Sequence, residues 1–150
     1  MVARKSLKGD YCPSARSLDV IGDWWSLLIV RDAFDGMTRF GEFQKSLGIA
    51  KNILTDRLKT LVQSGILEAV PIGDGNARVE YRLTAVGKDL FPVMVALRQF
   101  GERHLFAPDE ERSRLVERET GLSVRLDVRT EDGRVIGPDQ AVILKVPEPD

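Results

Sequence analysis

The chain has 150 residues, of which 43% are hydrophobic and 30% charged, with 22 Lys and Arg against 23 Asp and Glu. This composition excludes a disordered chain, and the length suffices for one hydrophobic core with a small appendage. No apolar stretch approaches the ~20 residues of a membrane span, and none follows the basic residues near the start, so we expect neither an anchor nor a secretory signal. A single cysteine, Cys12, excludes an internal disulfide and a cysteine-based zinc site, and indicates a cytoplasmic protein.

Four helices are predicted in the first part of the chain, at residues 14–22, 23–34, 39–47 and 51–64. Pro13 precedes the first helix, and Asp23 is a favourable N-cap for the second. Apolar residues surround the second helix almost completely, so we expect it to be the buried centre of the domain, with Trp24 and Trp25 packed in the core. Only two or three residues separate the third helix from the amphipathic fourth helix, which is typical of a helix-turn-helix.

The apolar period changes after Gly65 from helical to alternating, which predicts a β-hairpin. Its strands are expected at residues 66–72 and 78–83, around a turn rich in Gly and Asn. Thr84 can then cap a long helix that runs to about Leu105, and Pro92 should kink that helix.

Residues 108–150 differ in character from the rest of the chain. An acidic linker over 109–119 is followed by an alternating run at 122–128, a turn at 131–134 and an extended apolar run at 141–146. These features predict a small β-hairpin that is not stable alone and packs on the main domain or on a partner subunit. The expected fold class is α+β: a winged helix-turn-helix domain, mostly helical with a β-hairpin wing, over residues 1–107, and a C-terminal hairpin extension over 108–150.

The fourth helix has the surface that DNA recognition requires. When Leu54 is placed at the centre of its buried face, the opposite face carries short polar and basic side chains that can reach base edges in a major groove. Arg78 at the wing can enter a minor groove or clamp a phosphate, and Arg39 at the start of the third helix is placed to contact the flanking phosphate backbone. The predicted DNA-binding residues are Arg39, Lys51, Asn52, Thr55, Arg57, Lys59 and Arg78.

Several of these residues have an alternative interpretation. Lys51, Lys59 and Arg39 can simply form a solvated face, as surface cations usually do. Arg57 lies beside the buried stripe and can instead brace the hairpin through Glu68 or Glu80. Asp56 repels phosphate, so it is either a reader of cytosine or a structural partner.

Taken together, a set of short motifs resembles the HxlR-type family of bacterial winged-helix transcriptional regulators, a branch close to the MarR type. The motifs are Cys12-Pro13, IGDWWSLLI at 21–29, DGMTRFGEF at 35–43, Gly48-Ile49, LTDRL at 54–58, GIL at 65–67, VEYRLT at 79–84 and Gly87. The resemblance implies a homodimer, held by the first and last helices of the domain, that binds a two-fold-related operator with half-sites ~10 bp apart. Asp23 replaces the usual basic residue, Ala50 stands where a Ser cap is usual, and nothing carries over to 108–150.

The resemblance also places Cys12 where some family members carry a cysteine that senses oxidants or electrophiles. The alternative is a small buried residue at the dimer seam. A small-molecule effector in a cleft near Trp24 is a further possibility. The only histidine, His104, has no partner for a histidine-based metal site, and no catalytic set is recognisable, so we expect no enzyme, cofactor or metal.

The sequence thus predicts a repressor that binds double-stranded DNA, with a winged-helix protein–protein interaction module using the C-terminal extension as the alternative. The near-neutral total charge does not exclude nucleic acid. Residues 1–107 hold 15 basic and 12 acidic residues, a net +3, whereas residues 108–150 hold 7 and 11, a net −4.

Overall fold

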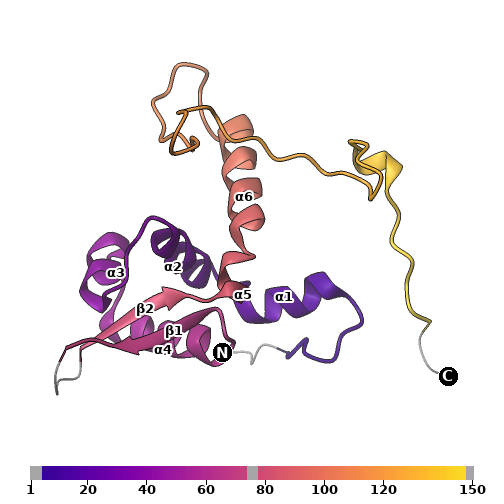
Figure 1. The fold of residues 1–150 in the computed structure, drawn as a ribbon. Coiled ribbons are helices and arrows are strands. Elements are labelled where there is room, and N and C mark those ends of the chain that lie inside the picture. The colour runs from indigo at the N-terminus through magenta and orange to yellow at the C-terminus, as the bar shows by residue number, and fades with distance from the viewer. Residues whose placement is uncertain (1–4, 74–77, 148–150) are drawn as a thin grey trace. The chain divides into compact units, whose positions relative to one another are not determined.

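The computed structural model describes residues 5–73 and 78–147 and divides the chain into two compact units, Met1–Phe91 and Pro92–Asp150. Helix α2 is the centre of the first unit, because it packs against α1, α3, α4 and strand β2 (Figure 1). Ile29 and Val30 of α2 are fully buried there with Phe43, Leu54 and Leu61. The elements of this unit are α1 (Pro13–Ile21), α2 (Trp24–Phe34), α3 (Phe40–Leu47), α4 (Lys51–Gln63), β1 (Leu67–Pro71), β2 (Val79–Leu83) and α5 (Ala85–Lys88). The four predicted helices and the hairpin are therefore confirmed.

The expectation that both tryptophans pack in the core is wrong for Trp24, whose surface is 71% exposed. The buried residues of α2 begin at Ser26, and Trp24 precedes it by two positions, which places the two on opposite faces of a helix. Trp25 is half-buried and meets the Trp24 ring edge-on, with ring centroids 5.6 Å apart.

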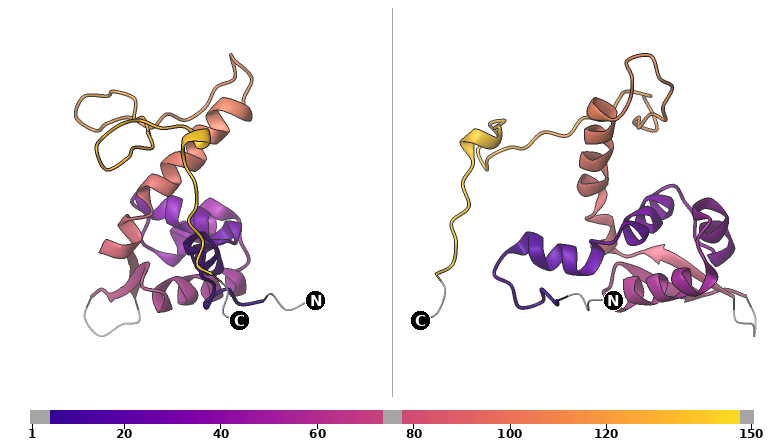
Figure 2. Two further views of the ribbon diagram at one scale, coloured as in Figure 1. Left: turned by 90° about the vertical axis from the view of Figure 1, so that its right-hand side faces the viewer. Right: turned by 180° about the vertical axis from the view of Figure 1, so that it is seen from behind.

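The wing is a two-stranded antiparallel sheet in which Leu67 lies opposite Leu83 and Pro71 opposite Val79. The segment before α3 continues this sheet on the outer side of β2. There the Tyr81 N–H donates to the Thr38 carbonyl at 2.7 Å. The wing is therefore attached at one edge to the start of the helix-turn-helix, an arrangement visible in Figures 1 and 2.

The single long helix expected from Thr84 to about Leu105 is instead two helices, α5 and α6 (Phe91–His104). The Thr84 cap forms as expected, since its hydroxyl accepts the Gly87 N–H at 3.0 Å. Helix α5 then ends in a tight turn in which the Leu90 N–H donates to the Gly87 carbonyl. Pro92 has no N–H to give to a continuous helix, but it is tolerated in the first turn of a new one. It therefore marks a helix start and not a kink.

Helix α6 and residues 105–147 make up most of the second unit. A small hairpin does form around the predicted turn at 131–134, where the Ile136 N–H donates to the Val128 carbonyl at 3.0 Å. The expected pairing of 122–128 with 141–146 is wrong: Val128 pairs with Ile136, and a short 3-10 helix, η1 (Pro138–Gln140), follows. Over the described ranges, no helix is long and apolar enough to cross a membrane.

Candidate nucleic-acid interface

The connection between α3 and α4 has the tight geometry of a helix-turn-helix. Gly48 ends α3 in the left-handed conformation with φ 60°, where a side chain would be strained, and its N–H donates to the Gln44 carbonyl. Ile49 is buried and fixes the turn to the core. Ala50 is the N-cap of α4 and supplies no side-chain hydrogen bond, as its residue type predicts. The N-terminus of α4 therefore has no side-chain cap at the Ala50 position.

Helix α4 buries Leu54, Leu58 and Leu61 and exposes the opposite face. The Thr55 hydroxyl donates to the Lys51 carbonyl at 2.8 Å, which holds the side chain against the helix and leaves its lone pairs free to accept. The predicted DNA-binding residues of this helix that are exposed are Lys51, Asn52, Thr55 and Lys59.

Arg57 has a different environment from the other predicted residues. Its Nε lies 3.2 Å from Asp23 Oδ1, and its Nη1 lies 3.5 Å from Asp56 Oδ2. The same Asp23 carboxylate caps α2, accepting the Ser26 N–H at 2.9 Å and the Ser26 hydroxyl at 2.6 Å. The expected brace through Glu68 or Glu80 is therefore wrong, and Asp56 is a partner of Arg57. This ion pair ties α4 to the start of α2 and neutralises one of the predicted cations.

Arg39 is the residue that precedes α3, and its exposed guanidinium forms no hydrogen bond or ion pair within the described residues. Its backbone N–H, together with that of Thr38, donates to the Glu42 carboxylate at 3.1 Å and 2.9 Å. These two backbone donors, Thr38 first, hold the pKa of Glu42 below its ordinary value. Glu42 thus fixes the backbone at Arg39, and the positive charge of Arg39 also helps to lower the pKa of Glu42.

Arg78 is exposed just before β2, and its carbonyl accepts the Ile72 N–H at 2.9 Å. The rest of the wing tip, residues 74–77, lies outside the described residues. Arg82, further along β2, is held by Glu80, whose Oε2 lies 2.6 Å from Arg82 Nη2. Arg78 is therefore the wing cation that has no carboxylate partner in the part of the chain described.

A lock between the wing and the end of α4 was not anticipated from the sequence. Thr84 donates its hydroxyl to the Gly65 carbonyl, and its N–H donates to the Ile66 carbonyl at 3.1 Å. Gly87 lies so close that a Cβ there would come 2.1 Å from the same Ile66 oxygen. In the sequence, Thr84 could be identified as a helix cap and Gly87 as part of a family motif. Their contact with the Gly65–Ile66 turn is seen only in the folded structure.

Cys12 is exposed in the isolated chain and forms the N-cap position of α1. Its N–H donates to Asp10 Oδ1 at 2.8 Å, and Arg16 donates from Nε to the Asp10 carbonyl at 2.6 Å. The thiol is therefore accessible, and the nearby arginine is engaged by backbone. Within the residues described, no three His, Cys, Asp or Glu side chains form a metal-binding group.

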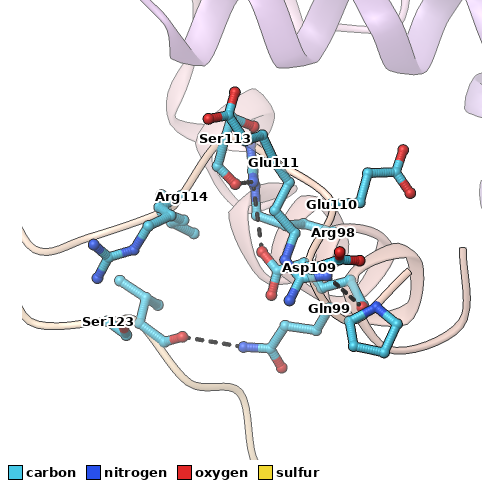
Figure 3. Close-up of a pocket in the computed structure, with 13 residues that line it drawn as sticks. Arg98, Gln99, Asp109, Glu110, Glu111, Ser113, Arg114 and Ser123 are labelled. Carbon is cyan, nitrogen blue, oxygen red and sulfur yellow. Dashed lines mark hydrogen bonds and ion pairs between the residues drawn. The ribbon is translucent and has the colours of Figure 1, made fainter. Parts of the chain in front are cut away.

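A cavity of about 470 Å³ lies in the second unit, between the last turns of α6 and residues 108–124 (Figure 3). Arg98 donates from Nη1 to the Ser113 carbonyl at 2.9 Å, and Gln99 donates from Nε2 to the Val124 carbonyl at 3.2 Å. These side chains hold the extension against one face of α6. Trp24, near which the sequence suggested an effector cleft, is not among the residues that line this cavity.

The fold and the exposed face of α4 define a winged helix-turn-helix protein. The HxlR-like helix-turn-helix family matches residues 20–109, so the chain belongs to this family. Rv3095 of Mycobacterium tuberculosis (strain ATCC 25618 / H37Rv), an uncharacterized HTH-type transcriptional regulator, is 44% identical over 94 residues, which are 63% of this chain and 60% of the relative. The chain thus spans about 60% of the length of the mycobacterial relatives that it matches.

Two solved structures extend the comparison. PA1607, a candidate transcription factor, is 55% identical with a TM-score of 0.86, covering 93% of this chain and 99% of PA1607. Since only 7% of the chain lies outside this match, most of residues 108–147 lie inside it. The reduced form of the redox regulator HypR is 32% identical with a TM-score of 0.59, covering 63% of this chain and 94% of HypR.

Proposed function

We propose that the chain is a sequence-specific DNA-binding transcriptional regulator that acts as a homodimer on a two-fold-related operator and represses transcription. The observation that carries this proposal is the exposed face of α4, where Lys51, Asn52, Thr55 and Lys59 project from a helix whose other face is buried. Arg39 and Arg78 supply exposed cations at the start of α3 and at the wing, and neither forms an ion pair within the described residues. Such a set combines groups for base edges with groups for phosphates.

Helix α6 supports the homodimer. Val93, Leu97 and Phe100 follow one another at i, i+4 and i+7, and each is about half exposed. On the opposite face of the same helix, Val95 is buried, and Arg98 and Gln99 hydrogen-bond to the chain's own extension. An apolar stripe on a helix that is already covered on its other side is suited to a second copy of the chain.

A salt titration of DNA binding tests the proposal, with DNA from beside the chain's own gene. We expect at least one fragment to bind far more tightly than the rest, whereas a uniform Kd of ~10⁻⁴–10⁻⁶ M at physiological salt would contradict specific recognition.

Asn52→Ala and Thr55→Ala should change the preference between sequences, and Arg78→Ala should weaken all sequences alike. Gln63→Ala, at the far end of α4, is the matched control and should change neither.

Oxidation of Cys12 is the proposed switch for this regulator. The exposure of the thiol supports it, as does the likeness to the redox regulator HypR. No second cysteine exists in the chain, so a disulfide requires the other subunit or a small thiol. We expect an oxidant to change operator affinity in the wild type and to have no effect in Cys12→Ser.

A small effector bound in the 470 Å³ cavity is a second proposed switch.

A winged-helix protein–protein interaction module is the second candidate function, because residues 141–146 are exposed and apolar. Deletion of residues 108–150 separates the two functions. The truncated chain should still bind the operator if it is a DNA-binding regulator, although the loss of cover on α6 will lower its stability. Loss of all DNA binding in a folded truncated chain would favour the second candidate.

A further inference from the structure

The last described segment of the chain, Ala141–Val146, has the composition of a buried strand and no partner. Its sequence, AVILKV, contains one polar residue, and the side chains of Val142, Ile143 and Leu144 are 82%, 80% and 90% exposed. A continuous apolar run rich in β-branched residues is typical of a strand covered on both faces. No backbone hydrogen bond joins residues 141–147 to any other part of the described chain.

The extension also contains an unpaired strand edge. Along residues 122–128 the backbone groups of the even-numbered positions are bonded. The Leu122 carbonyl accepts the Glu117 N–H at 2.7 Å, Gln99 holds Val124 and Leu126, and Val128 accepts from Ile136. Alternation of this kind indicates an extended strand whose even positions face one side.

The odd-numbered positions of this strand face the other side. The backbone N–H and carbonyl groups of Ser123, Arg125 and Asp127 make no hydrogen bond within the described ranges. This open edge is therefore a template for an incoming strand, in the same unit that leaves an apolar segment of the right length unpaired.

We propose that Ala141–Val146 is an exchanged arm, which pairs with the open edge at Ser123–Asp127 in a second copy of this chain. The inference deepens the proposed homodimer and rests on it only for the presence of that second copy. Strand addition of this kind takes its affinity from main-chain hydrogen bonds and from apolar side chains.

The folding of the connecting residues favours a second copy over the same chain. Ile136 already occupies the bonded side of the strand, so the arm would have to cross over the strand within residues 137–140 to reach the open side. These residues are folded on themselves, since the Gln140 N–H donates to the Gly137 carbonyl at 3.1 Å and the Gly137 N–H donates to Gln140 Oε1 at 2.9 Å. A second copy imposes no such crossing.

The exchanged surface is large enough to matter for a dimer. Two arms carry eight large apolar side chains, each of which removes ~60–120 Å² of apolar surface from water when it is buried. With the surfaces beneath them, the arms exceed the ~1,000 Å² of a specific interface. Only Val95 is a buried hydrophobic residue among the described residues of the second unit, so its stability needs such cover.

A substitution at the open edge tests the arm. Arg125→Pro removes an N–H that the chain itself does not use, and Arg125→Ala is the matched control that keeps it. We expect Arg125→Pro, and truncation after Gln140, to weaken the dimer at least ~100-fold in sedimentation equilibrium, while Arg125→Ala and truncation after Val146 leave it unchanged. Far-UV circular dichroism establishes that each variant is folded. Equal dimer affinities in folded variants of all four kinds would overturn the proposal.

A cross-linking experiment then identifies which chain the arm reaches. In a Cys12→Ser background, Arg125→Cys protein is mixed with Ile143→Cys protein and treated with a short bis-maleimide. Cross-linked pairs that contain one chain of each kind are expected. A chain that carries both Arg125→Cys and Ile143→Cys is tested in parallel. If only this doubly substituted chain forms a cross-link, and the cross-link lies within one chain, the exchange is overturned. Neither experiment uses DNA, so an arm that forms without operator binding, or operator binding without an arm, separates this inference from the proposed function.

Discussion

At the scale of single residues, Asp23 controls whether the Arg57 charge on α4 is available to contact a phosphate. Its carboxylate caps α2 and pairs with Arg57 at 3.2 Å. Asp23→Asn keeps a good cap but removes the carboxylate that lies 3.2 Å from Arg57 Nε, at little cost in stability. Arg57 then keeps only its longer, exposed contact with Asp56 at 3.5 Å. We expect a steeper fall of affinity with salt, by about 0.9 in the slope of log K against log salt, since one more phosphate is contacted.

Arg57→Gln in the Asp23→Asn background is the control, and it should restore the wild-type slope. An unchanged slope in Asp23→Asn itself would show that Arg57 does not reach DNA even without its Asp23 partner.

Gly87 is the residue on which the lock between wing and α4 depends. A Cβ at this position would come 2.1 Å from the buried Ile66 carbonyl, which is backbone and cannot step aside easily. We therefore expect Gly87→Ala to lower the free energy of unfolding by about 3 kcal/mol in urea denaturation. Gly41→Ala, in α3 with open space around it, is the matched control and should raise it by up to ~1 kcal/mol. Effects of the same sign would contradict this account of the close approach.

At the scale of elements, Glu42 fastens the start of α3 by accepting two backbone N–H groups. Its pKa is lowered in the folded chain, so it stabilises the fold above the ordinary glutamate pKa of about 4.3, and that contribution is lost as pH falls through the lower folded value. We expect Glu42→Gln to be less stable than the wild type at pH 7, with the difference vanishing on acidification. Thermal unfolding of the wild type and of Glu42→Gln at pH 7 and at acidic pH measures this difference, and an equal gap at both pH values would contradict the role of the Glu42 carboxylate.

The elements that the sequence predicted correctly are those defined by local signals. Caps such as Asp23 and Thr84, helix ends such as Gly48, and the apolar period of α4 all act over a few residues. The wrong predictions concern features that depend on contacts between residues far apart in the sequence. Trp24 is exposed because of the face that α2 buries, Arg57 is held by a residue 34 positions away, and Val128 pairs with Ile136 in place of the 141–146 run. The exposed face of α4 could be read from the sequence, whereas the loss of Arg57 from it could not.

At the scale of the whole molecule, charge is divided between the two parts of the chain. The net +3 of residues 1–107 attracts DNA, and the net −4 of residues 108–150 opposes that attraction through solvent. Asp109, Glu111 and Glu119 are exposed carboxylates of the extension that form no hydrogen bond or ion pair within the described residues, so their charges are not neutralised by such a partner. The extension should therefore suppress non-specific binding more than operator recognition.

Neutralising these three carboxylates tests that expectation. Asp109→Asn, Glu111→Gln and Glu119→Gln together bring the extension from −4 to −1. We expect tighter binding to random duplex DNA at ~0.01 M salt, where the screening length is ~30 Å, and a much smaller effect at 0.15 M, where it is ~8 Å. Arg118→Gln, which makes the extension more negative, should shift affinity in the opposite direction at low salt. A gain that persists undiminished at 0.15 M would mean that these side chains meet the DNA directly, and a long-range field would no longer explain their effect.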